Sequence, residues 1–425
     1  MTSFLTADKR ILLLRRSDKV GSYRGKWSAV SGYLEGREEP LARAVTEIRE
    51  ELGLSSEQIR LVRMGGTVRA FDENTDTVWV IHPYLFEAKS KAIELDWENI
   101  DYRWVSPEEL ASYETVPKLK EALDRVRYDF QAEPSSLARI IRSVEELAGD
   151  KVHGATFLGR QAVGLLSEAA QASDAGDADA LFYHLLLIGS RLRRVQPAMA
   201  NVWNLTGKVL HLVDQQRTRG MAIAELKASV QRLNGEVLER VKEDSENVAR
   251  NTAQVLPQDG FVLTHSYSST VLRSLELGFK GGRRFKVYAT ESYPGMEGRE
   301  LSKELVELGV PVTLIADSAV YSIIQSVSLV LVGADSVLRD GHLIHKTGTK
   351  RIGVAAERLG IPVYSACETV KLSIQDFLGE RPEVPATLFD VTPAEFVSGY
   401  ITEDGRLAPG RVERRIRDLQ KEIYP

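Results

Sequence analysis

The chain has 425 residues, of which 43% are hydrophobic and 27% are charged, and its formal net charge is −5. This size and composition indicate a globular protein with more than one hydrophobic core. The acidic balance argues against the broad basic surface typical of direct nucleic-acid binding and leaves a local basic pocket as the alternative. The sequence has no apolar run of about 18 residues and no signal-peptide pattern, so we expect no membrane partner and a cytoplasmic protein. The single cysteine, Cys367, excludes a disulfide within the chain.

The first part of the chain, residues 1–131, alternates segments typical of strands and helices. Strand-like runs lie at 2–5, 11–16, 59–70 and 77–88, and a helical pattern lies near 117–130. A turn at 7–9 separates the first two runs, as in a β-hairpin. This mixture predicts an α/β/α sandwich. We interpret Trp79, Trp97 and Trp104 as core and rim aromatics, with substrate stacking as the alternative.

A glutamate-rich helix is predicted between the second and third strand-like runs. From Gly32 to Leu54 the sequence reads GYLEGREEPLARAVTEIREELGL, and Glu47, Glu50 and Glu51 fall on one helical face. Like charges at this spacing repel one another, so a divalent cation that neutralises them is expected, either Mg²⁺ or Mn²⁺. The alternative is an ordinary solvated acidic face.

The register of this stretch is similar to the signature of the Nudix hydrolase family. The matching positions are Gly32, Glu38, Glu47, Ile48, Glu50, Glu51, Gly53 and Leu54. The resemblance implies metal-dependent hydrolysis of a nucleoside diphosphate linked to a group X, such as ADP-ribose or a nucleotide sugar. It implies metal ligation by Gly32, Glu38, Glu47, Glu50 and Glu51. It also implies catalysis by Glu47, Glu50 and Glu51, with Glu47 orienting or deprotonating the attacking water.

One position departs from the family pattern. Thr46 stands where the family has the arginine that holds the neighbouring glutamates, which favours a domain that binds without hydrolysing. Arg43 lies one turn before Glu47 and offers a guanidinium from the same face as a substitute. Glu98 is a candidate additional metal ligand or base, as in some members of the family.

The second part of the chain follows a predicted linker at 131–136, QAEPSS, and we place the boundary at 132. Over 132–255 apolar residues recur at three- and four-residue spacing, which predicts a helical subdomain. Over 256–425 short apolar runs alternate with helical patterns. These runs lie at 260–266, 285–292, 310–317, 329–337 and 361–368. Five such runs predict a Rossmann-like, doubly wound parallel sheet.

Polar residues follow each of these apolar runs. They are His265 and Ser266, Glu291 and Ser292, Asp317 and Ser318, Gly333 to Asp335, and Glu368 and Thr369. In open parallel sheets ligands bind beyond the carboxyl ends of the strands, so we expect a binding site there. The alternative is that these residues only cap the following helices.

Eight ordered segments of this part carry a second resemblance. They are VHGAT at 152–156, RVQPAMANVWN at 194–204, LTHSYSSTVL at 263–272, ATESYPGMEGRELSKEL at 289–305, TLIADSA at 313–319, LVGADSVLRDGHLIHKTGT at 331–349, IPVYSACETVK at 361–371 and FDVTPAEFVSGYITEDG at 389–405. Together they resemble the family of the translation initiation factor 2B α, β and δ subunits, ribose-1,5-bisphosphate isomerase and methylthioribose-1-phosphate isomerase. The resemblance implies binding of a phosphorylated sugar or nucleotide by Ser266, Arg299, Asp335, Lys346 and Gly348, and a homodimer formed through the C-terminal domain.

This part also departs from the isomerases of its family. They carry a cysteine directly after the Thr-His pair, where this chain has Ser266. An alcohol is far less acidic than a thiol, so Ser266 disfavours isomerisation although Asp335 is present. Tyr293 replaces an arginine and His345 an asparagine, which favours binding without turnover. Cys367 is interpreted as a buried structural thiol.

The two resemblances predict a Nudix hydrolase joined to a domain that binds a sugar phosphate or nucleotide. A sugar phosphate released by the first domain would then be a ligand for the second. Two alternatives remain at this point. One is a non-catalytic regulatory or initiation-factor-2B-like protein that binds metabolites, and the other is a working sugar-phosphate isomerase.

Overall fold

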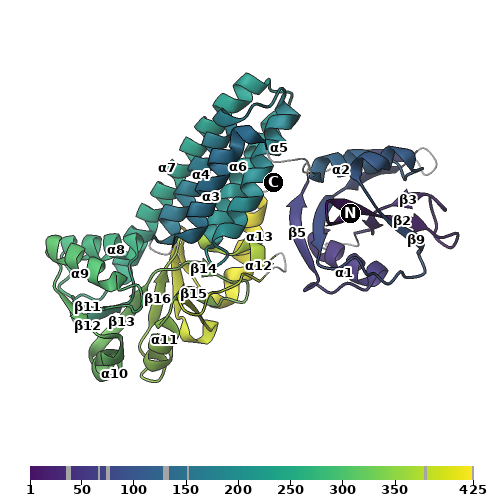
Figure 1. Cartoon of the computed structure of the whole chain (residues 1–425). Helices are drawn as coiled ribbons and strands as arrows, with labels where there is room; N and C mark the ends of the chain where they lie inside the picture. Colours follow the sequence, from purple (N-terminus) through teal and green to yellow (C-terminus); the bar gives the residue numbers. More distant parts are fainter. Residues whose placement is uncertain are drawn as a thin grey trace. The chain divides into compact units, whose positions relative to one another are not determined.

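The computed structural model describes residues 1–34, 40–65, 68–72, 77–127, 134–150, 153–377 and 381–423. The chain divides into two compact units, Met1–Ala132 and Glu133–Phe377 with Arg381–Pro425 (Figure 1). Within the described ranges, none of the helices combines the length and the apolar character needed to cross a bilayer.

The first unit is built on a mixed β-sheet. Its main path runs β3 (Trp27–Ser28), β2 (Arg10–Arg16), β1 (Thr2–Ala7), β8 (Pro83–Ala88) and β5 (Ile59–Met64), while β4 (Val30–Ser31) pairs with β1 and β9 (Asn99–Val105) pairs with β2. β1 and β2 form the predicted hairpin, and β1 runs parallel to β8. Asp8 and Lys9 occupy the turn with positive φ values of 48° and 62°.

Two helices cover opposite faces of this sheet (Figure 1). They are α1 (Pro40–Leu52) and α2 (Leu119–Val126), and a 3₁₀ helix at Pro107–Ser112 precedes α2. α2 packs Leu123 and Val126 against Phe4 of β1. α1 buries Ile48 and Leu52. The sandwich predicted from the sequence is therefore confirmed.

A separate two-stranded ribbon corrects two of the predicted strands. Within the described ranges β6 (Val68–Asp72) and β7 (Thr77–Ile81) pair with each other and with no further strand, so the predicted runs 59–70 and 77–88 each divide in two. Pro83 explains the second break, because proline has no N–H for a ladder and begins β8 instead. Gly65, which follows β5, marks the first break.

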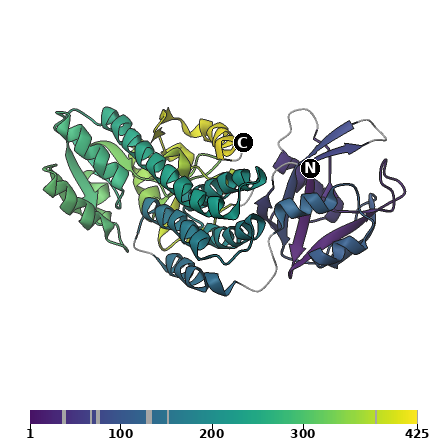
Figure 2. The ribbon, with the colours of Figure 1, turned by 90° about the horizontal axis from the view of Figure 1, so that it is seen from above.

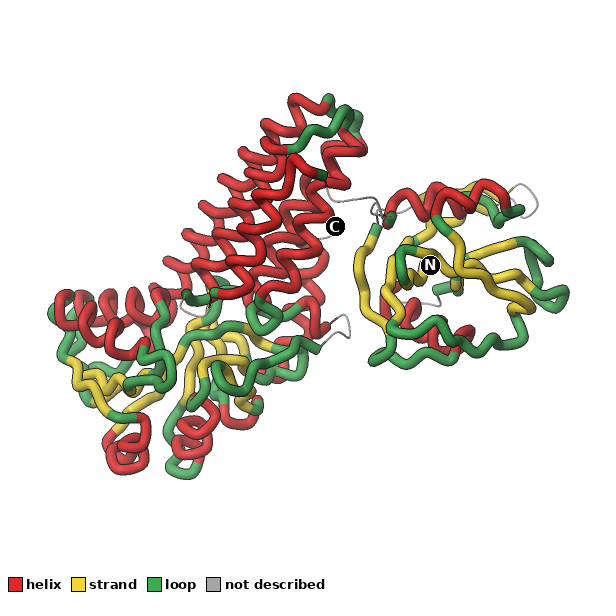
Figure 3. The backbone as a smooth tube through the Cα atoms, in the orientation of Figure 1, coloured by secondary structure: helices red, strands yellow, loops and turns green. Residues whose placement is uncertain are grey.

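The second unit begins with a helical bundle. Its helices are α3 (Ala138–Gly149), α4 (Ala155–Ala172), α5 (Ala178–Val195), α6 (Ala200–Thr218) and α7 (Ile223–Val255). The long helices run side by side (Figure 2) and bury Leu166, Leu185 and Val230 completely. Towards its C-terminal end α7 joins a second core, in which Val248 packs with Leu275. α7 therefore connects the bundle to the sheet that follows (Figure 3).

The sheet of the second unit has the predicted doubly wound arrangement. Its order is β12 (Val312–Ile315), β11 (Lys286–Thr290), β10 (Phe261–Thr264), β13 (Val327–Val332), β16 (Val363–Ala366), β18 (Gly399–Thr402) and β19 (Gly405–Leu407). The strands from β12 to β18 are parallel, and β19 returns antiparallel. The chain reverses its direction of winding between β10 and β13, where such folds form their binding crevice.

The remaining elements flank this sheet. They are α8 (Ser269–Lys280), α9 (Glu297–Glu307), α10 (Val320–Ile323), α11 (Thr349–Glu357), α12 (Ile374–Phe377), α13 (Val412–Ile423) and a small sheet of β14 (Ser336–Val337), β15 (Leu343–Lys346) and β17 (Phe389–Thr392). α8 and α9 lie on one face of the large sheet, and α10 and α11 lie on the other (Figure 1). The first turn of α9 packs closely against the end of β11. A Cβ on Gly298 would lie 1.7 Å from the carbonyl oxygen of Thr290, so a residue with a side chain does not fit there.

Candidate functional site

The acidic face of α1 lies partly inside the first unit. Glu47 and Glu51 are buried, with exposed fractions of 7% and 4%, whereas the side chain of Glu50 is 52% exposed. The helix must direct its apolar stripe, which includes Ile48 and Leu52, towards the sheet. Glu47 and Glu51 lie next to this stripe on the helix, so the same orientation buries their side chains.

Glu51 is held by two neutral donors. Its carboxylate accepts hydrogen bonds from the backbone N–H of Ser31 at 3.0 Å and from Nδ2 of Asn99 at 2.9 Å. Burial nevertheless raises the pKa of Glu51 to about 8, because these hydrogen bonds only partly offset the loss of hydration. Asn99 begins β9 and was not singled out from the sequence.

Glu47 is paired with the guanidinium of Arg43. The two side chains are 2.6 Å apart, and the same guanidinium lies 4.0 Å from Glu50. Burial raises the pKa of Glu47, and Arg43 opposes that shift. Gly32 contacts the same carboxylate, since a Cβ on Gly32 would lie 1.8 Å from Oε1 of Glu47. Only a residue without a side chain fits there without displacing Glu47.

Thr46 does not replace the missing arginine. Its hydroxyl donates to the carbonyl oxygen of Ala42 within the same helix at 3.1 Å, in an exposed position. This local hydrogen bond is the usual one for a threonine in a helix. Arg43 therefore supplies the guanidinium on this face, as the sequence hypothesis required.

Glu98 is a fourth acid of this site. Burial and the nearby Asp96 raise the pKa of Glu98, and the charge of Glu98 in turn raises the pKa values of Glu47 and Glu51. Glu38, predicted as a metal ligand, lies outside the described residues. In the part of the chain that the structure describes, no group of three or more His, Cys, Asp or Glu side chains is arranged to hold a metal ion. The donors themselves are oxygen atoms, the type that Mg²⁺ and Mn²⁺ prefer.

The carboxyl ends of the strands in the second unit form a separate polar cluster. Ser266, directly beyond β10, has φ of 64° and is 2% exposed. Its Oγ has no hydrogen-bond partner among the described residues. Its backbone N–H donates to Oγ of Ser292, which lies beyond β11, at 2.6 Å. An unpaired buried hydroxyl is costly, so Ser266 is a candidate contact for a bound ligand.

Asp335 lies beyond β13 and is 5% exposed. Burial raises the pKa of Asp335 to about 6, although the positive charges of Lys346 and Lys371 oppose that shift. Lys346 pairs with Glu297 of α9 at 2.9 Å, and Lys371 pairs with Glu368 at 2.8 Å. Asp335 is thus a buried carboxylate surrounded by cations that are already engaged elsewhere.

The turn at 347–349 packs against the end of β10 through His265. The His265 ring contacts Oγ1 of Thr290 through Nδ1 at 2.6 Å and the carbonyl oxygen of Thr347 through Nε2 at 3.0 Å. Gly348 has φ of 116°, and a Cβ there would lie 2.9 Å from the His265 ring. The Gly348 N–H donates to Asp390 at 2.8 Å. The carboxylate of Asp390 therefore already occupies a backbone donor that the sequence assigned to a ligand anion.

Arg299 differs from the buried residues of this cluster because its side chain is exposed to solvent. Its side chain is 59% exposed and pairs with Glu291 at 2.7 Å. Tyr293 is 73% exposed, and the buried His345 contacts Oγ1 of Thr349 at 2.8 Å.

Cys367 is fully buried, and burial raises the pKa of its thiol. The interpretation of Cys367 as a buried thiol is confirmed.

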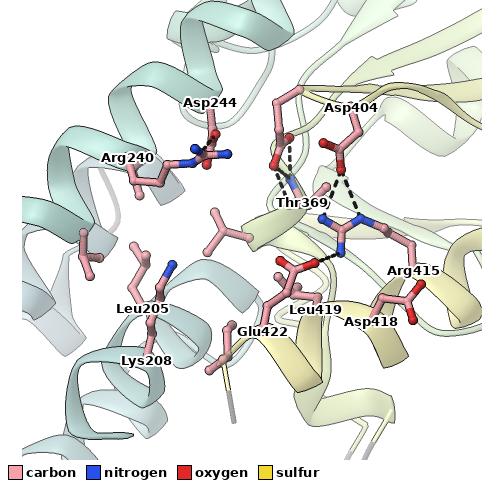
Figure 4. A pocket seen from close by; sticks show the side chains of 15 residues that line it. Leu205, Lys208, Arg240, Asp244, Thr369, Asp404, Arg415, Asp418, Leu419 and Glu422 are labelled. Carbon is pink, nitrogen blue, oxygen red and sulfur yellow. Dashed lines mark hydrogen bonds and ion pairs between the residues drawn. The ribbon is translucent and has the colours of Figure 1, made fainter. Parts of the chain in front are cut away.

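A cavity of about 400 Å³ lies between the bundle and α13 (Figure 4). Its charged side chains pair mainly with one another: Arg240 with Asp244 at 2.9 Å, and Arg415 with Asp404 at 3.1 Å. The two arginines that line the cavity are therefore already paired with acids that line it. Sequence reasoning missed this cavity because its lining comes from helices and loops far apart in the chain.

Comparison with known proteins identifies both parts of the chain. Residues 151–381 match the family model described as the Initiation factor 2 subunit family, and residues 2–126 match the NUDIX domain. The putative translation initiation factor eIF-2B subunit 2-like protein of Pyrococcus furiosus is 30% identical over 287 residues, which cover 64% of this chain and 98% of that protein. The ribose 1,5-bisphosphate isomerase of Archaeoglobus fulgidus is 31% identical over 295 residues, which cover 64% of this chain and 91% of that protein.

A solved structure supports the same conclusion. The translation initiation factor eIF-2B of Pyrococcus horikoshii OT3 matches with a TM-score of 0.55 and 27% identity, over 64% of this chain and 98% of that chain. Both resemblances read from the sequence are confirmed. The chain carries a NUDIX domain in its N-terminal part and belongs to the Initiation factor 2 subunit family through its C-terminal part.

Proposed function

We propose that the first unit is a hydrolase of nucleoside diphosphates linked to a group X, such as ADP-ribose or a nucleotide sugar, and that it uses Mg²⁺ or Mn²⁺. The observation that supports this most is the burial of Glu47 and Glu51 on one helix of a NUDIX domain, with the carboxylate of Glu47 against Gly32. Buried carboxylates with raised pKa values are typical of sites that bind cations or move protons.

Each residue of this site would have its own role in the hydrolysis. Glu50 and Glu51 would hold the metal, together with the Gly32 carbonyl and with Glu38, whose placement is not described. When bound, the metal would supply the positive charge that neutralises the diphosphate and polarises phosphorus. Glu47 would orient the attacking water and accept its proton, a role that its raised pKa supports. Glu98 would act as a further ligand or base.

Arg43 would be the positioning residue of this site. Its guanidinium lies 2.6 Å from Glu47 and 4.0 Å from Glu50, so one cation restrains two acids that would otherwise repel each other. Among the described residues Thr46 bonds to its own helix and adds nothing to this restraint.

For the second unit we propose binding of a phosphorylated sugar or nucleotide at the carboxyl ends of β10 and β13. The unpaired Oγ of Ser266, the buried Asp335 and the ammonium of Lys346 support this proposal. Arg299 would contact the ligand only if the ligand displaced Glu291 from its guanidinium. The Gly348 N–H would contact the ligand only if the ligand displaced Asp390. Such a ligand could be the sugar phosphate that the first unit releases, and a homodimer through this unit remains a prediction.

Two other functions compete with this one. A regulatory protein that binds metabolites without hydrolysis is favoured by Thr46 and by relatives named for translation initiation factor eIF-2B. A sugar-phosphate isomerase is favoured by relatives named ribose 1,5-bisphosphate isomerase. Ser266 argues against the isomerase, because a buried alcohol is a poor proton donor or acceptor compared with a thiol. A cytoplasmic location stays a prediction.

The hydrolase proposal is tested with the double variant Glu50→Gln, Glu51→Gln. Hydrolysis of a panel of nucleotide sugars and dinucleotides with Mg²⁺ or Mn²⁺ is measured by adding a phosphatase, which frees inorganic phosphate from the phosphomonoester products. We expect turnover by the wild type and a loss of at least about 100-fold in the variant, because the amides keep the shape but remove two anionic ligands. The control Glu57→Gln changes an exposed acid outside the site and should keep full activity. Absence of wild-type turnover on every substrate would favour the regulatory alternative.

The role of Arg43 is tested by moving its charge. Arg43→Ala should lower kcat at least about tenfold, because Glu47 and Glu50 lose their shared restraint. In that background Thr46→Arg should restore part of the rate, and Thr46→Gln is the matched uncharged control. The pH dependence of kcat should also shift, since Arg43 opposes the raised pKa of Glu47. An Arg43→Ala rate equal to the wild-type rate would refute this role.

The second site is tested through the stability of Asp335→Asn. Asp335 has a pKa of about 6 when folded against an ordinary value of 3.8, so the folded state binds the extra proton between these values. Stability is therefore lost as the pH rises from about 4 to 6, and above pH 6 ionisation costs about 3 kcal/mol. Asp335→Asn should raise the melting temperature at pH 8 but not at pH 4.

The same variant should lose the response to ligand. Ribose 1,5-bisphosphate should raise the melting temperature of the wild type by binding the folded state, without forming ribulose 1,5-bisphosphate. Asp335→Asn should show a much smaller rise. Formation of the ribulose product by the wild type would contradict binding without turnover, and equal ligand responses would remove Asp335 from the site.

A further inference from the structure

Two exposed aromatic side chains of the first unit touch each other. Tyr33 is 63% exposed and Trp79 is 36% exposed. Their ring centroids are 5.2 Å apart, and the ring planes are inclined by 43°. The neighbouring Leu34 is also 36% exposed. The two rings therefore form an exposed aromatic contact rather than part of the core.

This surface adjoins the acidic site. Tyr33 directly follows Gly32, the residue whose missing Cβ leaves room for the carboxylate of Glu47. Trp79 lies in the middle of β7, opposite Ala70 of β6. β6 and β7 form a two-stranded sheet of their own, and the contact of Trp79 with Tyr33 places its ring next to the residue that follows Gly32.

We propose that Tyr33 and Trp79 bind the nucleobase of the substrate by stacking, while its diphosphate lies at the glutamates of α1. This inference rests on the proposed hydrolase function and adds the two residues that would bind the base of the substrate. A base stacked on an aromatic side chain gains about 1–3 kcal/mol, and every base offers a π face for it. The site therefore selects diphosphates that carry an aromatic base, with little preference among bases. Trp79 is then a substrate contact, whereas the sequence had favoured a core or rim role.

The choice of a nucleobase over another occupant follows from the neighbouring charges. An apolar patch beside Glu47 and Glu50 suits a ligand with an aromatic end and an anionic end that brings a metal ion. A second copy of the chain is the competing occupant. It would place the same carboxylates of both copies near one interface, where like charges repel.

The test compares the double variant Tyr33→Ala, Trp79→Ala with the wild type. By calorimetry with Mg²⁺, ADP should bind the variant at least about tenfold more weakly, the loss expected for one lost stacking contact. Ribose 5-phosphate, which lacks a base, should bind both proteins equally. Tyr33→Phe, Trp79→Phe should keep the wild-type affinity for ADP. Tyr102→Ala, which removes a tyrosine of β9 that is as exposed as Trp79 (36%), should leave the affinity unchanged.

Kinetics separate this inference from the function on which it rests. KM for ADP-ribose should rise at least about tenfold in the double alanine variant, with kcat within about twofold. If ADP binds the double alanine variant more weakly than the wild type but the wild type shows no turnover, the stacking proposal is supported and the hydrolase proposal is contradicted. Unchanged ADP affinity would overturn the stacking surface whatever the turnover. A change from dimer to monomer on size exclusion with unchanged ADP affinity would assign the patch to a second copy.

Discussion

The first unit depends on burying carboxylates on α1 against its sheet with too few cations to match them. The apolar stripe of the helix requires this orientation, and Glu47 and Glu51 are carried inward beside it. Neutral donors hold Glu51, whose pKa is raised to about 8, and a single guanidinium holds Glu47. Such an arrangement lowers the stability of the metal-free protein and would be relieved by the proposed divalent cation, so the constraint on the fold and the proposed chemistry would have the same origin.

The second unit also buries polar groups that are only partly compensated, at the edge of a parallel sheet. Winding in two directions from β10 and β13 leaves the carboxyl ends of these strands facing a common crevice. Ser266 and Asp335 are buried there without full compensation, while the cations around them are engaged by other acids. A ligand with phosphate and hydroxyl groups would satisfy these residues. Both candidate sites therefore contain buried polar groups whose charge or hydrogen-bonding capacity is only partly satisfied.

Local signals in the sequence predicted the acidic helix, the hairpin at 7–9 and the five parallel strands, because periodicity and motif spacing act within short windows. The short strands β18 and β19 were missed, since their pairing depends on β16 far back in the chain. The same limit applies to the sites. No spacing rule shows that Asp390 already occupies the Gly348 N–H, that Asn99 holds Glu51, or that Tyr33 meets Trp79.

Binding of Mn²⁺ to the protein tests the account most directly, because it requires no knowledge of the substrate. Electron paramagnetic resonance of free Mn²⁺ should show saturable binding to the wild type. This binding should be lost in the Glu50→Gln, Glu51→Gln variant and kept in Glu57→Gln. Equal binding by all three proteins, or no saturable binding by the wild type, would contradict the claim that the buried acids of α1 form a metal-dependent site.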